Sequence, residues 1–316
     1  MPRICVIGSA NVDHTLALPR LPHPGETVSG GMLLTNLGGK GANQAVAARK
    51  LGAEVRMLGA VGEDGPGREI RERLDALGID VTGIVPVAGA ATGTALIFVD
   101  AEGRNQIGVA PGANHRLTVE MLRPYEGAIA WADVVVCQLE TPLPVVRWAL
   151  EEAHRLGVRA ILNPAPVREL PDDLLGLVAY LTPNAGEAAA LAGLPVGDMD
   201  SAREAGRRLL ERGAATVIVT LGGEGALVCQ RDRIVHFPAF PVAVVDTTAA
   251  GDAFNGALAV GLAAGGTLEE AVPLAGAAAA LTCTRRGAQD SLPERAEVER
   301  FLRALRAGQG PPEGTP

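Results

Sequence analysis

The sequence predicts an α/β fold in which a mainly parallel sheet is sandwiched by helices and carries a small β-sheet lid. Short β-branched runs alternate with helical stretches rich in Ala, Leu and Arg, as where 134–137 is followed by 145–156 and then by 160–162. This rhythm is typical of βαβ units, whose right-handed crossovers place helices on both faces of the sheet. Two segments break the rhythm, and both have the features of β insertions.

We expect a single domain over residues 1–307, followed by a flexible Gly- and Pro-rich tail at 308–316. The two insertions, about 14–37 and 92–109, are expected to pair into the lid. The second contains apolar runs at 95–99 and 106–109 on either side of a turn at Gly103. Such a lid would cover a ligand at the sheet, and its exposed strands favour pairing between two copies of the chain.

The composition favours a small ligand. The chain has 316 residues, of which 47% are hydrophobic and only 3% aromatic, so its core must consist mainly of Ala, Val, Leu and Ile. The net charge is -8, and there is no basic cluster beyond Arg285 and Arg286. These features argue against nucleic acid or an anionic membrane as the main partner.

We expect a cytoplasmic protein with free, buried thiols. The cysteines lie far apart and form no C-x-x-C pair, which predicts neither a zinc site nor a disulfide framework. The first residues show no charged segment leading into a long apolar run, and the apolar stretch at 271–283 is too short to span a membrane. The cysteines are Cys5, Cys137, Cys229 and Cys283.

The first strand, 4–7, leads directly into the motif N-x-D. Strand alternation puts Asn11 and Asp13 on one side, where they can hydrogen-bond vicinal hydroxyls of a sugar. An Asx turn is the competing interpretation.

A glycine-rich segment, 38–44, opens a helix that runs through Arg49. Lys40 within it is informative, because only two of the 28 basic residues are lysines. The segment is no Walker A motif, since Gly41 stands where Ser or Thr is needed. It is no dinucleotide motif either, because Gln44 occupies the last glycine position and no regular strand is predicted before it. A structural turn is the alternative.

Three further motifs follow predicted strands. Glu140 ends the strand 134–137, at the edge where open α/β sheets bind ligands, and either holds another hydroxyl or is simply solvated. Asn184 and Glu187 share a helix face and either supply oxygens to Mg²⁺ or form a capping box. The glycine turn 220–225, after the strand 216–220, suits a nucleotide phosphate or ribose but is also common in hairpins.

The strongest signal is the segment 244–256, which passes from a strand through small residues into a helix predicted at 253–264. Free N–H groups at the start of that helix, together with its dipole, form an anion site suited to a transferring phosphoryl group. We expect Asp252 at the N-cap position. A carboxylate beside such a site is also where a general base for an attacking hydroxyl belongs.

In order, these motifs resemble the ribokinase-like, or PfkB-type, carbohydrate kinases over nearly the whole chain. The resemblance is carried by N-x-D, G-G-K-G-A-N-Q-A-V-A-A, Q-L-E, N-P-A-P, T-P-N-x-x-E, T-L-G-x-x-G, D-T-x-A-A-G-D-x-F-N-G-A-L and T-R-x-G-A-Q-x-S. It implies an ATP-dependent phosphorylation of a sugar, with D-ribose at its 5-hydroxyl as the expected substrate, and a homodimer formed through the lid.

The resemblance also implies roles for individual residues. Asp252 would be the catalytic base, with an anion hole made by the amides of Ala249, Ala250 and Gly251. The sugar would be held by Asn11, Asp13, Gly39, Lys40, Asn43, Glu140 and Asp252. ATP would lie along Asn184, Thr220, Gly222, Gly225 and Gly251, with Mg²⁺ near Glu187 through water. A monovalent cation, K⁺, would be held mostly through carbonyl oxygens, by Asp246, Thr248, Thr282, Arg285, Gly287 and Ser291.

Two residues depart from the wider family pattern, and three rival functions stay open. Ala249 stands where the family usually has Gly, although one branch shares the Ala, and Ala185 replaces an acidic residue that is sometimes present. The closest rival is the same phosphotransfer on deoxyribose, fructose or a nucleoside such as adenosine. A non-catalytic sugar-binding regulator would be expected to lose the base or the phosphate elements. A nicotinamide oxidoreductase is disfavoured because no G-x-G-x-x-G follows the first strand.

Overall fold

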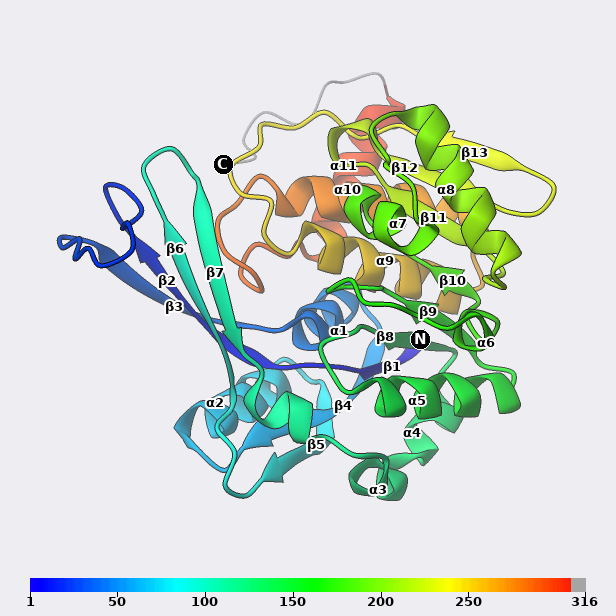
Figure 1. Ribbon diagram of the computed structural model, residues 1–316. Coiled ribbons are helices and arrows are strands. Elements are labelled where there is room, and N and C mark those ends of the chain that lie inside the picture. Colours follow the sequence, from blue (N-terminus) through cyan, green and yellow to red (C-terminus); the bar gives the residue numbers. More distant parts are fainter. Residues whose placement is uncertain (308–316) are drawn as a thin grey trace.

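A computed structural model describes residues 1–307 and arranges them in one large and one small β-sheet (Figure 1). The large sheet has nine strands, most of them parallel, with helices on both faces, and the small sheet has four strands. The predicted fold class is therefore confirmed. The flexible tail predicted at 308–316 lies outside the described residues.

The large sheet has the strand order β13-β12-β11-β10-β9-β8-β1-β4-β5. Its strands run parallel from β5 to β11, and β12 and β13 complete one edge in antiparallel pairing. The bounds are β1 (Arg3–Ile7), β4 (Glu54–Gly62), β5 (Asp80–Val87), β8 (Val134–Cys137), β9 (Arg159–Leu162), β10 (Tyr180–Leu181), β11 (Val217–Thr220), β12 (Ala226–Cys229) and β13 (Ile234–Phe237). Parallel strands all end at the same edge, so the loops that follow them meet there.

Each face of the large sheet packs against its own set of helices. In β1, Ile4 and Val6 belong to one buried cluster, and Cys5 and Ile7 belong to the other, as strand alternation requires. The first cluster includes α1 (Lys40–Lys50), α2 (Gly65–Ala76), α9 (Ala250–Ala263), α10 (Leu268–Thr282) and α11 (Arg295–Arg306). The second includes α3 (Val119–Leu122), α4 (Gly127–Trp131), α5 (Leu143–Arg155), α6 (Asp172–Leu175), α7 (Ala185–Ala192) and α8 (Met199–Glu211). None of the helices within 1–307 combines the length and apolar character needed to cross a membrane.

The small sheet is the predicted lid, and it projects from one side of the body (Figure 1). Its order is β3-β2-β6-β7, in which β2 and β6 are parallel and the outer pairs antiparallel. The bounds are β2 (Asn11–Ala17), β3 (Met32–Gly38), β6 (Gly93–Val99) and β7 (Asn105–Ala110). The prediction that no regular strand precedes the glycine-rich segment is wrong, because β3 continues to Gly38 and pairs with Asn11 across the lid.

Helix α1 approaches both β1 and α9 closely because glycines stand at the contacts. A Cβ on Gly41 would lie 2.6 Å from the carbonyl carbon of Gly8. A Cβ on Gly256 of α9 would lie 2.6 Å from the Cβ of Ala47 and 2.8 Å from the carbonyl oxygen of Gln44. These approaches pack α1 closely against α9, which is the arrangement on which the site depends.

The cysteines are unpaired, as predicted. Cys5, Cys137 and Cys229 are buried, but Cys283 is only half-buried, so the prediction of buried thiols is wrong at that position. Cys283 is the C-cap residue of α10.

Candidate active site

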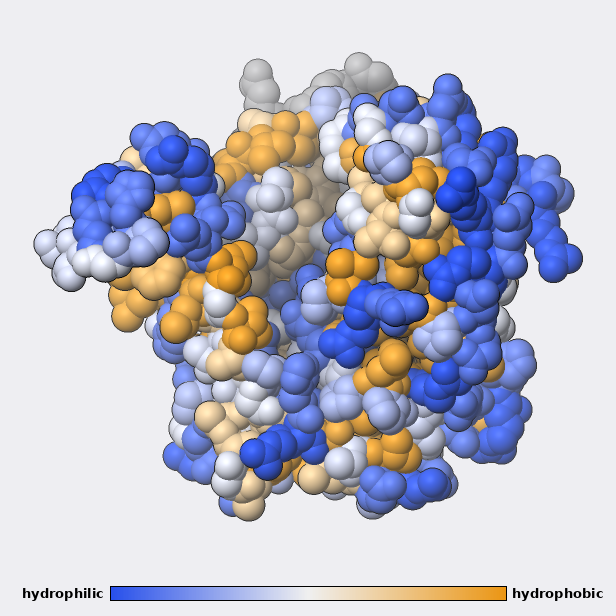
Figure 2. Space-filling view, viewed as in Figure 1, coloured by the Kyte–Doolittle hydropathy of each residue, from blue (hydrophilic) through white to orange (hydrophobic). Residues whose placement is uncertain are grey.

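The predicted site residues gather at the carboxyl edge of the large sheet, beside the lid. The surface is hollowed between the lid and the body (Figure 2). Asn11 follows β1, Glu140 follows β8, and Asn184 follows β10, so the parallel sheet brings three distant motifs to one edge.

Glu140 links this edge to α1. Its carboxylate accepts a hydrogen bond from the Ser9 hydroxyl and another, of 3.0 Å, from the backbone N–H of Lys40. Glu140 is therefore not simply solvated. Between these residues, Gly39 has a φ of 90°, and a Cβ there would lie 2.8 Å from the Cα of Ala10, so only glycine fits.

Asn11 and Asp13 lie in β2 and share one face of the strand, so the Asx-turn alternative is wrong. Asn114, in the short helix η1 (Gly112–Arg116), donates from Nδ2 to Oδ1 of Asn11 at 2.8 Å. Its Oδ1 accepts from the N–H of Ala10 at 3.0 Å. Asn114 thus fixes the orientation of Asn11, a role that the sequence did not suggest because Asn114 belongs to no recognised motif.

The charged groups of the site shift one another's pKa values. Burial, with the nearby carboxylates of Glu140 and Asp252, raises the pKa of Asp13 to about 6. Burial opposes the charged form of Lys40, but the carboxylates around it outweigh that effect and raise its pKa. Those carboxylates are Asp252, Glu140, Glu187 and Asp13.

Asp252 is the third residue of α9 and only 6% exposed, so its predicted N-cap position is wrong. Its Oδ2 accepts from Nδ2 of Asn43 and its Oδ1 from Nε2 of Gln44, each at 2.9 Å. Burial raises the pKa of Asp252, whereas Lys40, Asn43 and Gln44 act to lower it. The carboxylate therefore depends on α1 for its hydrogen bonds.

The N-cap of α9 is Ala249, with a φ of 60° and a ψ of 7°. Among residues 1–307 it is the one residue other than glycine with a positive φ. The N–H of Ala250 donates to the carbonyl of Thr247 at 3.2 Å, whereas those of Ala249 and Gly251 have no hydrogen-bond partner in the described part of the chain. The helix start thus presents free N–H groups beside the buried carboxylate of Asp252.

The residues expected along ATP, apart from Gly251 of α9, lie at or just after the ends of β10 and β11. Asn184 forms an isolated β-bridge with Thr220, and the N–H of Thr220 donates to the carbonyl of Pro183 at 2.9 Å. Gly225 closes the turn after β11, where a Cβ would lie 2.1 Å from the carbonyl oxygen of Phe237. The capping-box alternative is correct for Glu187, because its carboxylate accepts from both the N–H and Nδ2 of Asn184 at 2.9 Å.

The loop that follows α10 lies beside the segment that precedes α9. Asp246 joins them, since its Oδ1 accepts from the N–H and the hydroxyl of Thr248 and its Oδ2 accepts from the N–H of Gly287 at 3.0 Å. The N–H groups of Val245 and Asp246 also donate to the carbonyl of Cys283. The hydrogen bonds of Asp246 outweigh its burial and lower its pKa, which keeps it ionised.

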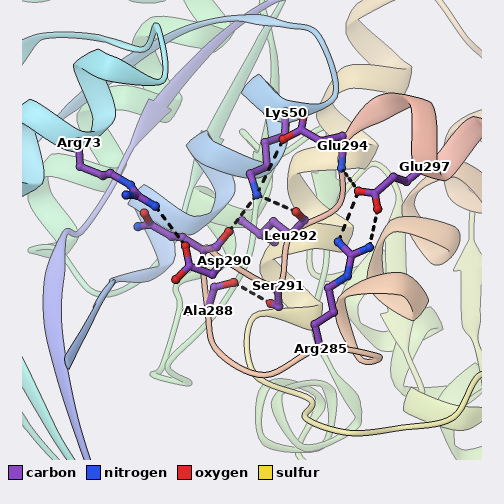
Figure 3. Close-up of polar contacts among 10 residues, drawn as sticks. Lys50, Arg73, Arg285, Ala288, Asp290, Ser291, Leu292, Glu294 and Glu297 are labelled. Atoms are coloured by element: carbon purple, nitrogen blue, oxygen red, sulfur yellow. Dashed lines mark hydrogen bonds and ion pairs between the residues drawn. The ribbon is translucent and has the colours of Figure 1, made fainter. Parts of the chain in front are cut away.

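Figure 3 shows how side chains hold this loop from outside. Lys50, at the end of α1, donates to the carbonyl oxygens of Gln289 and Leu292 at 3.2 and 2.8 Å. Arg285 pairs with Glu297 of α11. The hydroxyl of Ser291 donates to the carbonyl of Ala288 at 2.7 Å, and that of Thr282 donates to Ala278 at 2.9 Å. The six residues predicted for a monovalent cation therefore lie on two joined segments.

Comparison with known proteins agrees with this geometry. The family model described as pfkB family carbohydrate kinase matches residues 1–295. Ribokinase of Haemophilus influenzae is 41% identical over 299 residues, which cover 95% of this chain and 98% of that protein. A deoxyribokinase of Salmonella typhi is 38% identical over 300 residues, covering 95% and 98%. The structure of Arabidopsis thaliana ribokinase complexed with ribose and ATP matches with a TM-score of 0.90 and 33% identity, covering 95% of this chain and 98% of that one.

Proposed function

Because this chain belongs to the pfkB family of carbohydrate kinases, we propose that it phosphorylates D-ribose at the 5-hydroxyl, using ATP and releasing D-ribose 5-phosphate and ADP. The carrying observation is the buried carboxylate of Asp252 beside the free N–H groups that start α9. A base next to an anion site is what transfer of a phosphoryl group to a hydroxyl requires. The similar ribokinases support ribose as the acceptor.

The sugar is proposed to lie between the sheet edge and the lid, held by Asn11, Asp13, Gly39, Lys40, Asn43 and Glu140. One structural feature supports this assignment. Oδ1 of Asn43 is buried and has no hydrogen-bond partner among the described residues. A buried acceptor without a partner costs free energy, which a ligand hydroxyl would recover by donating to it.

Asp252 is proposed to accept the proton of the 5-hydroxyl as that oxygen attacks the γ-phosphorus in line. The bond from the γ-phosphorus to the β,γ-bridging oxygen breaks, and ADP leaves. The amides of Ala249, Ala250 and Gly251 are proposed to stabilise the charge on the transferring group, with Ala250 giving up its long bond to Thr247. Asp252→Asn should lower turnover by roughly 10²- to 10⁴-fold with little loss of ribose binding.

ATP is proposed to lie along Asn184, Thr220, Gly222, Gly225 and Gly251. Mg²⁺ bound to ATP would neutralise phosphate charge, and we propose that Glu187 contacts it through water. Both oxygens of Glu187 already accept hydrogen bonds from Asn184, which fits an indirect contact better than a direct one.

K⁺ is proposed to bind between the segments joined by Asp246, with Thr248, Thr282, Arg285, Gly287 and Ser291. A carboxylate, that of Asp246, together with backbone carbonyl oxygens of the other residues is the kind of donor set that suits a weakly hydrated monovalent cation. Bound there, the cation would supply positive charge near the start of α9.

The best alternative is the same reaction on deoxyribose, because a deoxyribokinase is nearly as similar in sequence as the ribokinases. Fructose, adenosine and a non-catalytic sugar-binding role have less support. Asp252 and the start of α9, which a non-catalytic descendant would be expected to lose, are both present.

We also propose a homodimer formed through the lid. Lid residues of the described chain expose large apolar side chains, and β3 and β7 have free edges. The exposed residues are Met32, Leu33, Leu34, Leu96, Ile107 and Val109.

We propose a cytoplasmic location, with which the unpaired cysteines agree.

The experiment that tests the function is a coupled assay of ADP release with D-ribose, deoxyribose, fructose and adenosine in turn, each with Mg²⁺ and with or without K⁺. The proposal predicts turnover with ribose that K⁺ raises. Preference for deoxyribose would replace the substrate but keep the site, and no turnover with any of the four would reject the proposed function.

A further inference from the structure

Gln44 stands behind the carboxylate of Asp252 in a chain of buried amides. It lies in α1, its side chain is fully buried, and its Nε2 donates to Oδ1 of Asp252 at 2.9 Å and to Oδ1 of Asn163 at 3.2 Å. Its Oε1 accepts from Nε2 of Gln138 at 2.7 Å. Gln138 and Asn163 follow β8 and β9, so the strand ends hold Gln44 in place.

The hydrogen bond from Gln138 determines which end of the Gln44 amide faces Asp252. An amide has an oxygen that only accepts and a nitrogen that only donates, so an oxygen engaged by Gln138 leaves the nitrogen for the carboxylate. Gln138 is fully buried, and its Oε1 occupies the space that a side chain at position 8 would need. A Cβ on Gly8 would lie only 2.0 Å from that oxygen, so the glycine makes room for Gln138.

Gln44 and Asn43 contact opposite oxygens of Asp252, but they do so from different environments. Asn43 has its free Oδ1, and we have proposed that it contacts the sugar. Gln44 has neither exposure nor a free acceptor, and its hydrogen bonds go to Asp252, Asn163 and Gln138. Whatever Gln44 contributes to the reaction therefore acts through Asp252.

The surroundings make this support necessary. Burial disfavours the ionised form of Asp252, and the carboxylate of Glu140 disfavours it further. The fields of Asp13 and Glu187 also reach Asp252, and Lys40 is the cation that acts against them. The amide of Gln44, already held at 2.9 Å from Asp252, stabilises the ionised carboxylate, and no other group has to be ordered for this.

We propose that Gln44, oriented by Gln138, is a positioning residue that holds the carboxylate of Asp252 in the orientation and ionised form needed to accept a proton. This inference rests on the function proposed above. It assigns to the Q of the G-G-K-G-A-N-Q segment a role distinct from sugar binding.

The test compares Gln44→Leu and Gln44→Glu with the parent protein in single-turnover and steady-state kinetics between pH 5 and 9. Gln44→Leu removes the donor at similar volume. It should lower the rate of phosphoryl transfer by roughly 10- to 100-fold, because small losses of alignment at the reacting group have effects of this size. The KM for D-ribose should change less than about threefold, since Gln44 is proposed not to touch the sugar, whereas loss of sugar binding would raise KM.

The pH profile supplies a signature that a general structural effect would not produce. Loss of the donor raises the pKa of Asp252, so the acidic limb of the rate profile should move to higher pH. Gln44→Glu keeps the side-chain shape but places a second carboxylate beside Asp252. The acidic limb of the rate profile of this variant should therefore move to still higher pH. The inference would be overturned if both variants kept the parent's rate of phosphoryl transfer and the parent's acidic limb in the pH profile.

Gln138→Leu provides the coupling test. Gln138 contacts Gln44 and not Asp252, so its loss should change the rate in the same direction by a smaller factor. The double variant with Gln44→Leu should be no slower than Gln44→Leu alone, because the effect of Gln138 passes through Gln44. Multiplying rate losses would show that Gln138 acts independently and would overturn the assigned order.

Asp252→Asn separates this inference from the proposed function. Retained turnover in Asp252→Asn would reject the base role itself. Lost turnover in Asp252→Asn, together with parent-like kinetics in both Gln44 variants, would reject only the positioning role. Melting temperature and calorimetric ribose binding identify any variant whose loss comes from misfolding, and Gln44→Glu then carries the test because its volume is unchanged.

Discussion

At Asp13, the role proposed in sugar binding conflicts with the stability of the folded protein. Asp13 is proposed to contact a sugar hydroxyl, yet burial and the carboxylates of Glu140 and Asp252 raise its pKa to about 6. In the unfolded chain an Asp has a pKa of about 3.9. The folded protein therefore binds this proton more tightly, and stability falls as pH rises through about 6.

Asp13→Asn should make the ligand-free protein more stable at pH 7.5, by about 1 to 3 kcal/mol, because a raised pKa of roughly two units corresponds to that range. The difference should disappear below about pH 3, where Asp13 is protonated in both states. Urea unfolding at the two pH values measures it, and ribose affinity should fall in the same variant. An equal stabilisation at both pH values would contradict the assignment.

Ala249 is a second residue where a local cost accompanies the site. Its left-handed φ of 60° disfavours any side chain by roughly 1 to 2 kcal/mol, whereas glycine costs about 0.5 to 1 kcal/mol in lost chain freedom. Ala249→Gly should therefore raise the free energy of unfolding by up to about 1 kcal/mol.

The matched control is Ala250→Gly, because Ala250 is the next residue and lies in the helix. The free energy of unfolding of the Ala250→Gly variant should fall by about 0.5 kcal/mol. Urea unfolding measures both variants. A less stable Ala249→Gly variant would show that the left-handed backbone is not strained.

At the scale of elements, the sequence predicted several strands of the large sheet, among them 4–7, 134–137 and 160–162, and the order of the motifs, but it did not place the start of α9. The strands carry β-branched runs that are buried on both faces, a pattern visible locally. Helix α9 begins at Ala250 because Ala249 adopts the left-handed conformation, and no side chain marks that residue as a cap. Asp252 was predicted as the N-cap because Asp is common at that position. Its hydrogen-bond partners, Asn43 and Gln44, are more than 200 positions away in the sequence.

The loop after α10 depends on α1 through one side chain. Lys50 is half-buried and donates to two carbonyl oxygens of the loop, and burial lowers its pKa without removing its hydrogen bonds. Lys50→Met should cost about 2 to 4 kcal/mol, since hydrogen bonds from a charged donor contribute about 1.5 to 3 kcal/mol each and are not fully additive. Hydrogen exchange at 285–292 should become faster.

Arg73→Met is the control for that prediction. Arg73 contacts Asp290 of the same loop, but their side chains are 56% and 70% exposed, so this ion pair contributes little. Its removal should leave both stability and exchange within error of the parent. Equal effects of the two substitutions would contradict the role given to Lys50.

At the scale of the whole molecule, the lid leaves apolar surface that the chain itself does not cover. The sequence predicted the two insertions and their pairing into one sheet, because their turns and alternation are local, but it did not predict that β2 and β6 lie side by side in parallel. The roles of Asn114 and Gln44 were missed because a buried amide has no periodic signature in the sequence.

Leu34→Glu should convert the proposed dimer to a monomer at micromolar concentration, because a charge on the exposed apolar lid opposes its burial in an interface. Sedimentation velocity measures the change. Leu156→Glu, at an exposed apolar residue at the end of α5, should remain dimeric. A parent protein that is monomeric at tens of micromolar would reject the lid interface.

The way the lid is rooted limits how it can move. Four chain segments cross between the lid and the body: β1 enters β2, β3 enters α1, β5 leads to β6, and β7 leads to η1. A lid joined to the body by one segment could rotate freely. Four connections restrict its motion mainly to a bend about the line on which they lie. Asn11 and Gly38 face each other across β2 and β3 at those connections, so a bend of the lid about that line would displace Asn11, which is proposed to hold the sugar.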